Sequence, residues 1–452
     1  MAENTQLGIP AVGYRPSDSP DDVGAFDAHH PPSEELIDDC VHCGFCLPSC
    51  PTYALWGEEM DSPRGRIHLM KTGLEGAPLT DTMVGHFDAC LGCMACVSSC
   101  PSGVQYDKLI GATRPQVERH HERTRGEKLL REAIFRLFPY PKRLRLLRGP
   151  LRLYQRTPLS GVLRRSGLLD RISPSLRVLE SLAPPLNKRE PIPVRTPAVG
   201  QRRAVVGMLT GCVQSAFFPD VNAATVRVLT AEGCEVITPK AQGCCGALSE
   251  HLGREDEGLR FARELIDTFA AAEVTHVVVN AAGCGSQMKD YAHLLRDDTE
   301  YAERAEEFTA KVRDVSELLA ELGTVARRHP LPVTVAYHDA CHLAHAQGIR
   351  SQPRQLLGEI PGLEVREITD AALCCGSAGV YNILNPVPAD ELGDRKAANV
   401  LATGAQLLVT ANPGCLMQIA TAAERAGHPI SMAHTVQVLD ASIRGLPTSS
   451  LL

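Results

Sequence analysis

Residues 40–51 read CVHCGFCLPSCP and residues 90–101 read CLGCMACVSSCP, so one short cysteine pattern occurs twice early in the chain. Each copy has the spacing C-x2-C-x2-C-x3-C-P, which lets three thiolates on a tight loop converge on one cubane while the fourth points away. A zinc site held by four cysteines is the competing interpretation, but it needs two C-x2-C pairs rather than a triplet and a fourth cysteine. The two complete copies favour iron-sulfur clusters.

The pattern resembles that of two-cluster ferredoxins, in which the fourth cysteine of each run binds the other cluster. This resemblance implies an α-helical domain with two [4Fe-4S] clusters, which we place at residues 34–112. Arg64 and Arg66, between the runs, are candidate cofactor-binding cations that would raise the cluster potentials, and the alternative is that they are surface arginines. The implied ligands are Cys40, Cys43, Cys46 and Cys100 for one cluster, and Cys90, Cys93, Cys96 and Cys50 for the other.

Composition restricts the compartment and the partners. The 452 residues include 17 cysteines, and this excess in a chain without an export signal points to metal or redox chemistry rather than to disulfides. A net charge of −7 argues against nucleic-acid binding, and no apolar run reaches the roughly 18 residues of a spanning helix. We therefore expect a cytoplasmic protein. Residues 1–36 carry seven acidic residues and one basic residue, so residues 1–33 are predicted to be a disordered acidic tail.

Residues 113–203 are predicted to form a basic helical linker. Between Pro141 and Asp170 there are eight basic residues and one acidic residue, with leucines near helical spacing that Pro150 and Pro158 are expected to interrupt. One interpretation is a set of short amphipathic helices whose arginine face is solvated. The other is a contact with anionic lipid or with an acidic partner protein.

The rest of the chain has the pattern of an internal duplication, residues 204–330 and 331–446. VVGMLTGC ending at Cys212 matches VTVAYHDAC ending at Cys341 at an offset of 129, and VVVNAAGC ending at Cys284 matches LLVTANPGC ending at Cys415 at 131. Short β-branched runs alternate with helix-forming segments, which predicts parallel sheets covered by helices. The fold class is therefore a multidomain α+β and α/β protein, with strands expected at 205–209, 277–280, 333–337 and 407–410.

Both copies carry a Cys-Cys-Gly (CCG) loop between two outer cysteines. Ligands of parallel α/β sheets bind beyond the carboxyl ends of the strands, which is where the outer cysteines fall. Four thiolates per copy match a complete cluster shell, and the alternative is buried structural cysteines. Gly246 and Gly376 are expected to bind the cofactor by letting the backbone approach sulfur and iron. The expected ligands are Cys212, Cys244, Cys245 and Cys284 in copy one, and Cys341, Cys374, Cys375 and Cys415 in copy two.

These motifs together resemble the CCG-domain iron-sulfur subunits, a family that is similar to heterodisulfide reductase. The strings CVHCGFCLPSCPTYALWGEEMDSPRGRI, CLGCMACVSSCPSGVQY, GCCGALSEHL and LCCGSAGVYNILNP look most like the glycolate oxidase (glycolate dehydrogenase) iron-sulfur subunits. The family pattern ends in C-x2-C, whereas both copies here end in C-x2-Q, with Gln287 and Gln418. This departure argues against a five-cysteine noncubane cluster and against disulfide reduction.

The resemblance implies an electron-transfer subunit with no catalytic residues of its own. A partner subunit that contains FAD would oxidise glycolate, and this chain would relay single electrons toward a quinone-type acceptor. The relay would use the two [4Fe-4S] clusters and one or two further iron-sulfur centres in the CCG copies. We expect a cytoplasmic location, with the basic stretch around Arg143 to Arg165 as the candidate for a peripheral contact with the inner face of the membrane or with a partner.

Three alternatives stay open. The first is a CCG-centre reductase of a disulfide or a quinone, and the second is an iron-sulfur subunit of a lactate or glycerol-3-phosphate dehydrogenase. The third is a zinc-bearing scaffold. His338, His342 and His345 cluster around Cys341, and we interpret them as neighbours of a metal loop or as surface residues rather than as a base.

Overall fold

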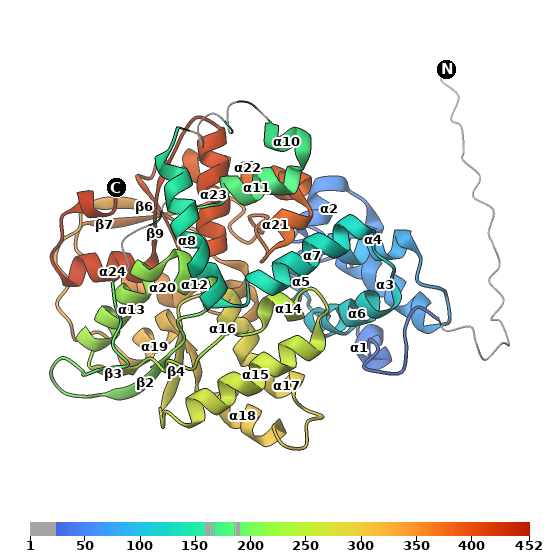
Figure 1. Ribbon diagram of the computed structural model, residues 1–452, viewed down its shortest axis with the longest axis horizontal. Helices are drawn as coiled ribbons and strands as arrows, with labels where there is room; N and C mark the ends of the chain where they lie inside the picture. Colours follow the sequence, from blue (N-terminus) through green and yellow to red (C-terminus); the bar gives the residue numbers. More distant parts are fainter. Residues whose placement is uncertain (1–23, 159–162, 164–165, 167, 185, 187–189) are drawn as a thin grey trace.

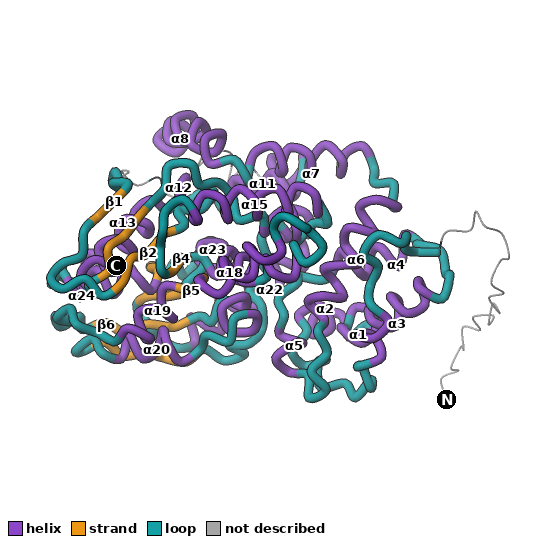
Figure 2. The backbone as a smooth tube through the Cα atoms, turned by 90° about the horizontal axis from the view of Figure 1, so that it is seen from below, coloured by secondary structure: helices purple, strands orange, loops and turns teal. Residues whose placement is uncertain are grey.

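The computed structural model describes residues 24–158, 163, 166, 168–184, 186 and 190–452. Figure 1 shows a helical N-terminal part, a group of linker helices and two α/β lobes in chain order. In Figure 2 the strands gather at one end of the molecule and the N-terminal helices at the other. Within the described part of the chain, no helix has the length and apolar character needed to cross a membrane.

The N-terminal part is a set of short helices around the two cysteine runs. Its core contains Ile67, Met70, Phe87, Leu109 and Ile110, which are almost completely buried. This core is small, and Cys90 and Cys96 of the second run belong to it, whereas Cys43 of the first run is exposed. The helices are α1 (Glu34–Asp38), α2 (Pro51–Trp56), α3 (Pro63–Leu74), α4 (Asp81–Ala89), α5 (Ala95–Ser99) and α6 (Tyr106–His120), with a 3₁₀ turn η1 (Glu59–Asp61).

The predicted acidic tail divides into two stretches. Residues 1–23 lie outside the described residues, and the prediction of disorder is wrong for residues 24–33. Ala25 is completely buried in the N-terminal core, and the backbone N–H of Asp27 donates to Gln116 Oε1 on α6 at 2.9 Å. The Asp27 carboxylate pairs with Arg119 at 2.9 Å. The composition of the segment is unfavourable for a core of its own, but polar pairing with α6 orders it.

The linker is helical, and its helices are longer than the sequence predicts. Helix α7 begins with a capping box in which Thr124 and Glu127 bond each other's backbone N–H groups. The prediction that Pro150 interrupts the next helix is wrong, because α8 continues through it. A proline weakens a helix interior, but the apolar side of α8 packs over the CCG cysteines, and this packing keeps the helix continuous. The helices are α7 (Arg125–Leu137), α8 (Pro141–Arg156), α10 (Leu168–Ile172) and α11 (Pro174–Ser181).

Copy one forms a five-stranded sheet in the order β1-β3-β2-β4-β5. Strands β2 to β5 are parallel, and β1 joins the β3 edge as an antiparallel strand. Its strands are β1 (Arg195–Thr196), β2 (Ala204–Met208), β3 (Cys234–Ile237), β4 (His276–Val279) and β5 (Val312–Asp314). Its helices are α12 (Val213–Phe217), α13 (Pro219–Ala231), α14 (Ala247–Glu250), α15 (Glu255–Ala270), α16 (Ala282–Lys289), α17 (Tyr291–Leu294), α18 (Ala302–Lys311) and α19 (Val315–Leu322).

Copy two repeats the topology as a four-stranded parallel sheet in the order β7-β6-β8-β9. The predicted parallel sheets covered by helices are thus confirmed. Its strands are β6 (Val333–Tyr337), β7 (Leu363–Glu367), β8 (Leu407–Thr410) and β9 (Ser431–His434). Its helices are η2 (His342–Ala346, a π-helical turn), α20 (Ser351–Gly358), α21 (Tyr381–Leu384), α22 (Pro386–Ala402), α23 (Pro413–Arg425), α24 (Thr435–Ile443) and the 3₁₀ turn η3 (Thr448–Ser450).

The two copies pack against each other through equivalent helices. Helix α13 of copy one contacts α24 of copy two, and α19 of copy one contacts α20 of copy two. One hydrophobic core continues across this interface and includes Val206, Val335 and Leu439, all fully buried. Cys234 belongs to the same core on β3. This arrangement brings the CCG loops of both copies to a common cavity.

Candidate metal centres

The eight cysteines of the N-terminal part line two separate small cavities. Each cavity contains three cysteines of one run and the last cysteine of the other run. The structure therefore brings together the exchanged sets that the ferredoxin resemblance implies. The first cysteine cavity contains Cys40, Cys43, Cys46 and Cys100, and the second cysteine cavity contains Cys50, Cys90, Cys93 and Cys96.

Left-handed backbone conformations shape both cysteine loops. His42 (φ 53°) and Gly44 (φ 86°) flank the second cysteine of the first run, and Gly92 (φ 63°) and Met94 (φ 61°) occupy the same positions in the second run. Left-handed residues within such loops turn successive N–H groups to one side, which makes a concave site for anions and iron-sulfur clusters. Only two of these four residues are glycine, so the side-chain pattern alone gives little indication of this backbone.

Arg66 is a buried cation at the second cysteine cavity. Its guanidinium donates to the carbonyl oxygens of Asp61 at 2.7 Å and of His86 at 2.6 Å, which fixes its position. Burial by itself raises the pKa of the Cys90 thiol, but the charges of Arg66 and Arg114 lower that pKa below its usual value. The alternative of a surface arginine is therefore wrong for Arg66.

Arg64 and Arg114 each bond the backbone of one cysteine run. Arg64 lines the first cysteine cavity and donates to the carbonyl oxygen of His42 at 2.9 Å. Arg114 donates to the carbonyl oxygen of Cys90 in the second run at 2.8 Å. No sequence pattern points to Arg114, because it lies in α6 outside both cysteine motifs. Each loop thus has one arginine that fixes its backbone.

All eight cysteines of the CCG copies line one cavity of about 650 Å³, which we call the thiol cavity. The thiols of each copy follow one another in contact, and Cys212 Sγ lies 3.7 Å from Cys244 Sγ. Contact with a neighbouring thiol, together with burial, raises the pKa of Cys284 and of Cys341 well above its usual value. Buried thiols of this kind become thiolates when a metal replaces their protons, so the donor set fits a metal cluster.

Gly246 and Gly376 follow the paired cysteines in left-handed conformation, with φ of 83° and 86°. A Cβ atom on Gly376 would lie 2.5 Å from the Ala389 carbonyl oxygen of α22, and one on Gly246 would lie 3.0 Å from the Gly258 carbonyl oxygen of α15. The N–H of Gly246 also donates to Cys244 Sγ at 3.4 Å. These glycines therefore serve the turn and helix packing, as well as the approach to sulfur that the sequence suggests.

The two copies differ beside their thiols. His338 is buried, and its ring nitrogen lies within 4.8 Å of the sulfur atoms of Cys375 and Cys415. At the equivalent position 129 residues earlier, copy one has Leu209. The interpretation of His338 as a surface residue is thus wrong, and its place fits a neighbour or a ligand of a metal centre.

Lys396 adds a second polar group on the copy-two side. It is 1% exposed, and its ammonium donates to the carbonyl oxygen of Asp370 at 2.5 Å. Burial lowers its pKa, although the nearby thiols of Cys375 and Cys374 oppose this effect. At an offset of 131, copy one has the apolar Leu265. The surroundings are therefore more polar in copy two.

Gln287 and Gln418, which replace the last cysteine of the family pattern, do not line the thiol cavity. Gln418 bonds the Ala389 carbonyl oxygen at 2.8 Å and the Asn382 side chain at 2.9 Å. Gln287 instead lines a polar pocket between α6 and copy one. Neither amide therefore stands in for a fifth thiol ligand.

The linker helices cover the thiol cavity. Leu144, Leu147 and Leu151 of α8 line it, as do Leu179 and Leu182 in and beside α11. Helix α8 lies against α12, which follows Cys212 (Figure 1). The leucine periodicity predicts these helices, but not that their apolar side faces the eight thiols.

Copy two makes direct contact with the second cysteine run. Cys93 belongs to the same buried cluster as Cys374, with Cys341 packed against it. Burial and the neighbouring Cys341 raise the pKa of Cys93. His345 Nδ1 lies 2.6 Å from Ser98 Oγ on α5, and His342 Nε2 bonds the carbonyl oxygen of Gly92. Two of the three histidines near Cys341 therefore connect copy two with the N-terminal part. The second cysteine cavity and the thiol cavity are therefore neighbours.

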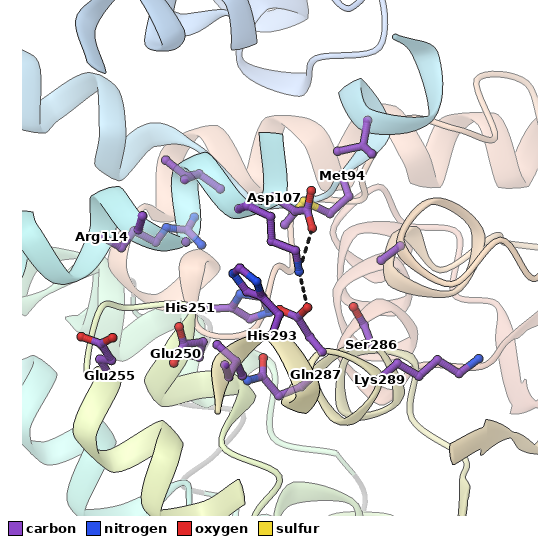
Figure 3. Close-up of a pocket in the computed structure, with 18 of the residues that line it drawn as sticks. Met94, Asp107, Arg114, Glu250, His251, Glu255, Ser286, Gln287, Lys289 and His293 are labelled. Atoms are coloured by element: carbon purple, nitrogen blue, oxygen red, sulfur yellow. Dashed lines mark hydrogen bonds and ion pairs between the residues drawn. The ribbon is translucent and has the colours of Figure 1, made fainter. Parts of the chain in front are cut away.

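The polar pocket between α6 and copy one has a volume of about 280 Å³ (Figure 3). Lys108 of α6 pairs with Asp290 there and with Asp107 at 3.3 Å. Burial and the carboxylates around it raise the pKa of Glu250 to about 8. His251 lines both this pocket and the thiol cavity. The sequence offered no signal for this cluster, because its members come from distant segments.

Comparison with protein-family models finds matches along most of the chain. A 4Fe-4S dicluster domain matches residues 36–104, and the linker region of the glycolate oxidase iron-sulfur subunit matches residues 126–183. The cysteine-rich domain model matches twice, at residues 206–289 and 335–420, which confirms the duplication.

Three curated relatives illustrate the similarity. The probable glycolate oxidase iron-sulfur subunit of Bacillus subtilis (strain 168) is 41% identical over 401 residues, which is 87% of this chain and 90% of that protein. The glycolate oxidase iron-sulfur subunit of Escherichia coli (strain K12) is 35% identical over 424 residues, 91% of this chain and 95% of that protein. Lactate utilization protein A of an Exiguobacterium species is 32% identical, but it matches only 53% of this chain and 98% of its own length.

Proposed function

The chain belongs to the family of glycolate oxidase iron-sulfur subunits, and on this premise we propose that it carries electrons from a flavoprotein that oxidises glycolate to a quinone-type acceptor. It is an iron-sulfur electron-transfer subunit of an oxidoreductase complex. The FAD group of the partner, the identity of the acceptor and the ligand assignments below are the parts that we propose.

The proposal depends most on one observation, the packing of Cys93 beside Cys341 and Cys374. The second cysteine cavity is linked to the first because each contains the last cysteine of the other cavity's run. It also adjoins the thiol cavity, since Leu91 lines both. Three groups of thiols thus follow one another through the protein. Iron-sulfur clusters accept and release single electrons, and this is the chemistry that they supply when bound.

The ligands we assign are the cysteines that the structure groups. Cys40, Cys43, Cys46 and Cys100 hold one [4Fe-4S] cluster, and Cys90, Cys93, Cys96 and Cys50 hold the second. The thiol cavity holds one or two further centres on Cys212, Cys244, Cys245 and Cys284, and on Cys341, Cys374, Cys375 and Cys415. The donor set supports iron-sulfur centres in each place, because these thiols are free and mostly buried.

Glycolate oxidation is a two-electron reaction, so we assign it to an FAD-containing partner that can accept a hydride and release single electrons. The chain's own residues then bind the clusters, place Arg64, Arg66 and Arg114 beside the cysteine runs, and cover the CCG thiols with apolar side chains of α8. We propose that the complex is cytoplasmic, with a peripheral membrane contact through α8. This helix carries six basic residues and no acidic residue.

The test combines the anaerobically purified chain, with its clusters intact, with the flavoprotein, glycolate and a soluble quinone. We expect glycolate-dependent quinol formation that requires the chain, and a loss of at least tenfold in the Cys93→Ser variant. Cys234→Ala is the matched control, because Cys234 is a buried cysteine of the β3 core and not a proposed ligand. Equal quinol formation without the chain, or faster turnover with lactate than with glycolate, would contradict the proposal.

A further inference from the structure

We propose that the thiol cavity also binds the quinone itself, with the side-chain amide of Gln214 donating a hydrogen bond to a quinone carbonyl. This inference rests on the proposed function, since it names where the acceptor of that relay binds.

The first observation is the composition of the cavity wall. Besides the eight thiols, the cavity extends to Leu147, Pro150 and Leu151 of α8 and to Leu182 and Pro184 beyond α11. Clusters require only the sulfur ligands, which all come from the CCG copies. An apolar wall from separate helices instead fits an organic ligand, since ligand sites are mostly apolar with few polar groups. The proposed relay ends at an electron acceptor, so a ligand in this cavity would have to be reducible as well as apolar. Quinones combine both properties.

The second observation is that Gln214 has no partner. This residue of α12 is 3% exposed and lines the cavity, and within the described structure neither its Nε2 nor its Oε1 makes a hydrogen bond. A buried amide without a hydrogen-bond partner is destabilising, so it requires an explanation. A bound carbonyl group would supply the missing acceptor.

The repeat supplies an internal comparison for Gln214. The equivalent position of copy two, 129 residues later, is Leu343, which is 1% exposed. The fold therefore accepts a leucine of similar volume at this place. The amide in copy one is not needed for packing, which supports a ligand role.

The third observation is the opening of the cavity at α8. Leu147 lines the cavity and is 42% exposed, so the wall that it forms reaches the surface. Leu146 and Leu153 of the same helix are strongly exposed. Exposed leucines among basic residues suit contact with an anionic lipid surface. A lipophilic quinone would then enter from the membrane beside α8.

The overall reaction balances without a further reagent. Glycolate and quinone give glyoxylate and quinol: glycolate loses two electrons and two protons, and the quinone gains two of each. The electrons reach the quinone through the relay, while the protons come from water. His251 lines both the polar pocket and the thiol cavity, so the two are adjacent at this side chain.

Binding of decylubiquinone to the oxidised, cluster-loaded chain tests the inference without electron flow. A photoreactive azidoquinone should label peptides of α8 or α12, and decylubiquinone should compete with the labelling. We expect Gln214→Leu to raise the Kd about tenfold, or about 1.4 kcal/mol. Gln287→Leu is the matched control, because Gln287 is also buried in copy one and has an unpartnered Nε2, but lines another pocket. Its Kd should equal that of the unchanged chain.

A second variant, Leu151→Trp, fills the cavity and should abolish labelling while the iron content stays the same. Equal affinity in the Gln214→Leu variant and the unchanged chain, or labelling only outside the cavity, would overturn the inference. If glycolate with the flavoprotein still reduces the clusters in that case, the proposed function stands and only the quinone site is wrong. If the clusters stay oxidised while quinone binds in the cavity, the relay is wrong and the site stands.

Discussion

His342 Nε2 donates to the carbonyl oxygen of Gly92 at 2.8 Å, and this bond joins copy two to the second cysteine run. Gly92 immediately precedes Cys93, and His342 immediately follows Cys341. Two residues 250 positions apart thus hold the neighbouring thiol groups in register. The contact supports the proposed passage of electrons between the N-terminal part and the CCG copies.

His342→Val tests this contact, since valine is the residue at the equivalent position of copy one, Val213. The buried Gly92 carbonyl would lose its donor, and we expect a loss of about 1–3 kcal/mol in stability. Differential scanning calorimetry measures this as a lower Tm. His428→Val, at an exposed histidine, serves as the control. An unchanged Tm for both variants would show that the contact contributes nothing.

The exchange of ligands between the cysteine runs is tested by iron content. Cys50→Ser and Cys93→Ser each should remove the second cluster, so the double variant should lack about four irons, as each single variant does. Cys50→Ser with Cys43→Ser should lack about eight, because these residues line different cavities. If instead the Cys50/Cys43 double variant lacked about four irons and the Cys50/Cys93 double variant about eight, Cys50 would belong to the first cavity.

Replacing Arg66 changes the electrostatics of the second cysteine cavity. Arg66→Leu removes a buried positive charge beside Cys90, so the reduced form of the cluster is stabilised less and its reduction potential should fall. Each 1.4 kcal/mol of lost stabilisation lowers the potential by about 60 mV. It also leaves Asp61 with a partly unpaired carboxylate, which has a stability cost of about 3–5 kcal/mol. An EPR-monitored redox titration decides the first point, with Arg66→Lys as the variant that keeps the charge. A potential that rises or stays constant in Arg66→Leu would exclude the role of this charge.

Glu250 makes stability depend on pH. Burial and its acidic neighbours raise the folded-state pKa of this carboxyl to about 8, above the ordinary 4.5. Between these values the folded protein holds a proton that the unfolded chain has released, so stability falls as pH rises from about 4.5 to about 8. The effect amounts to a few kcal/mol at most, about 1.4 per pKa unit.

Glu250→Gln should remove this dependence. The variant should melt at a higher temperature than the unchanged chain at pH 8 and at nearly the same temperature at pH 5. Thermal melts at both pH values, with Glu264→Gln on the exposed face of α15 as the control, provide the comparison. A Tm difference between Glu250→Gln and the unchanged chain that is equal at both pH values would contradict the assignment.

The peripheral contact through α8 is tested with vesicles of anionic lipid. Neutralising exposed basic residues of α8 should weaken binding by about 1 kcal/mol per residue and reduce its dependence on salt. Co-sedimentation at two ionic strengths measures both effects. If the α8 variant binds as well as the control variant, the contact lies elsewhere. The α8 changes are Lys142, Arg152 and Arg156 to Gln, and the control changes are Lys240, Lys311 and Arg327 to Gln.

Much of the fold was predictable because its signals are local. The strands Val333–Tyr337 and Leu407–Thr410 have the predicted bounds, since short β-branched runs with helical segments on either side leave few alternatives. The cysteine sets were predictable for the same reason, as their spacing is a local property. Pro150 shows the limit of this reasoning, because packing of α8 over the thiol cavity keeps the helix continuous despite the proline.

The parts that escaped prediction depend on long-range packing. Residues 24–33 look disordered in isolation, yet Asp27 finds its partners on α6. Gln214 is unremarkable in the sequence, and only its buried position on the cavity wall makes it a candidate. The bond between His342 and Gly92 is likewise invisible in the sequence. Composition and spacing carry no information about such pairs.

The most direct test of the account is EPR spectroscopy of the anaerobically purified chain, frozen after mixing with its flavoprotein and glycolate. The account predicts signals of reduced [4Fe-4S] clusters, with at least eight irons per chain, and a Cys93→Ser variant in which the CCG centres stay oxidised. A colourless chain without these signals, or CCG centres that are reduced as fast in Cys93→Ser as in the unchanged chain, would contradict it.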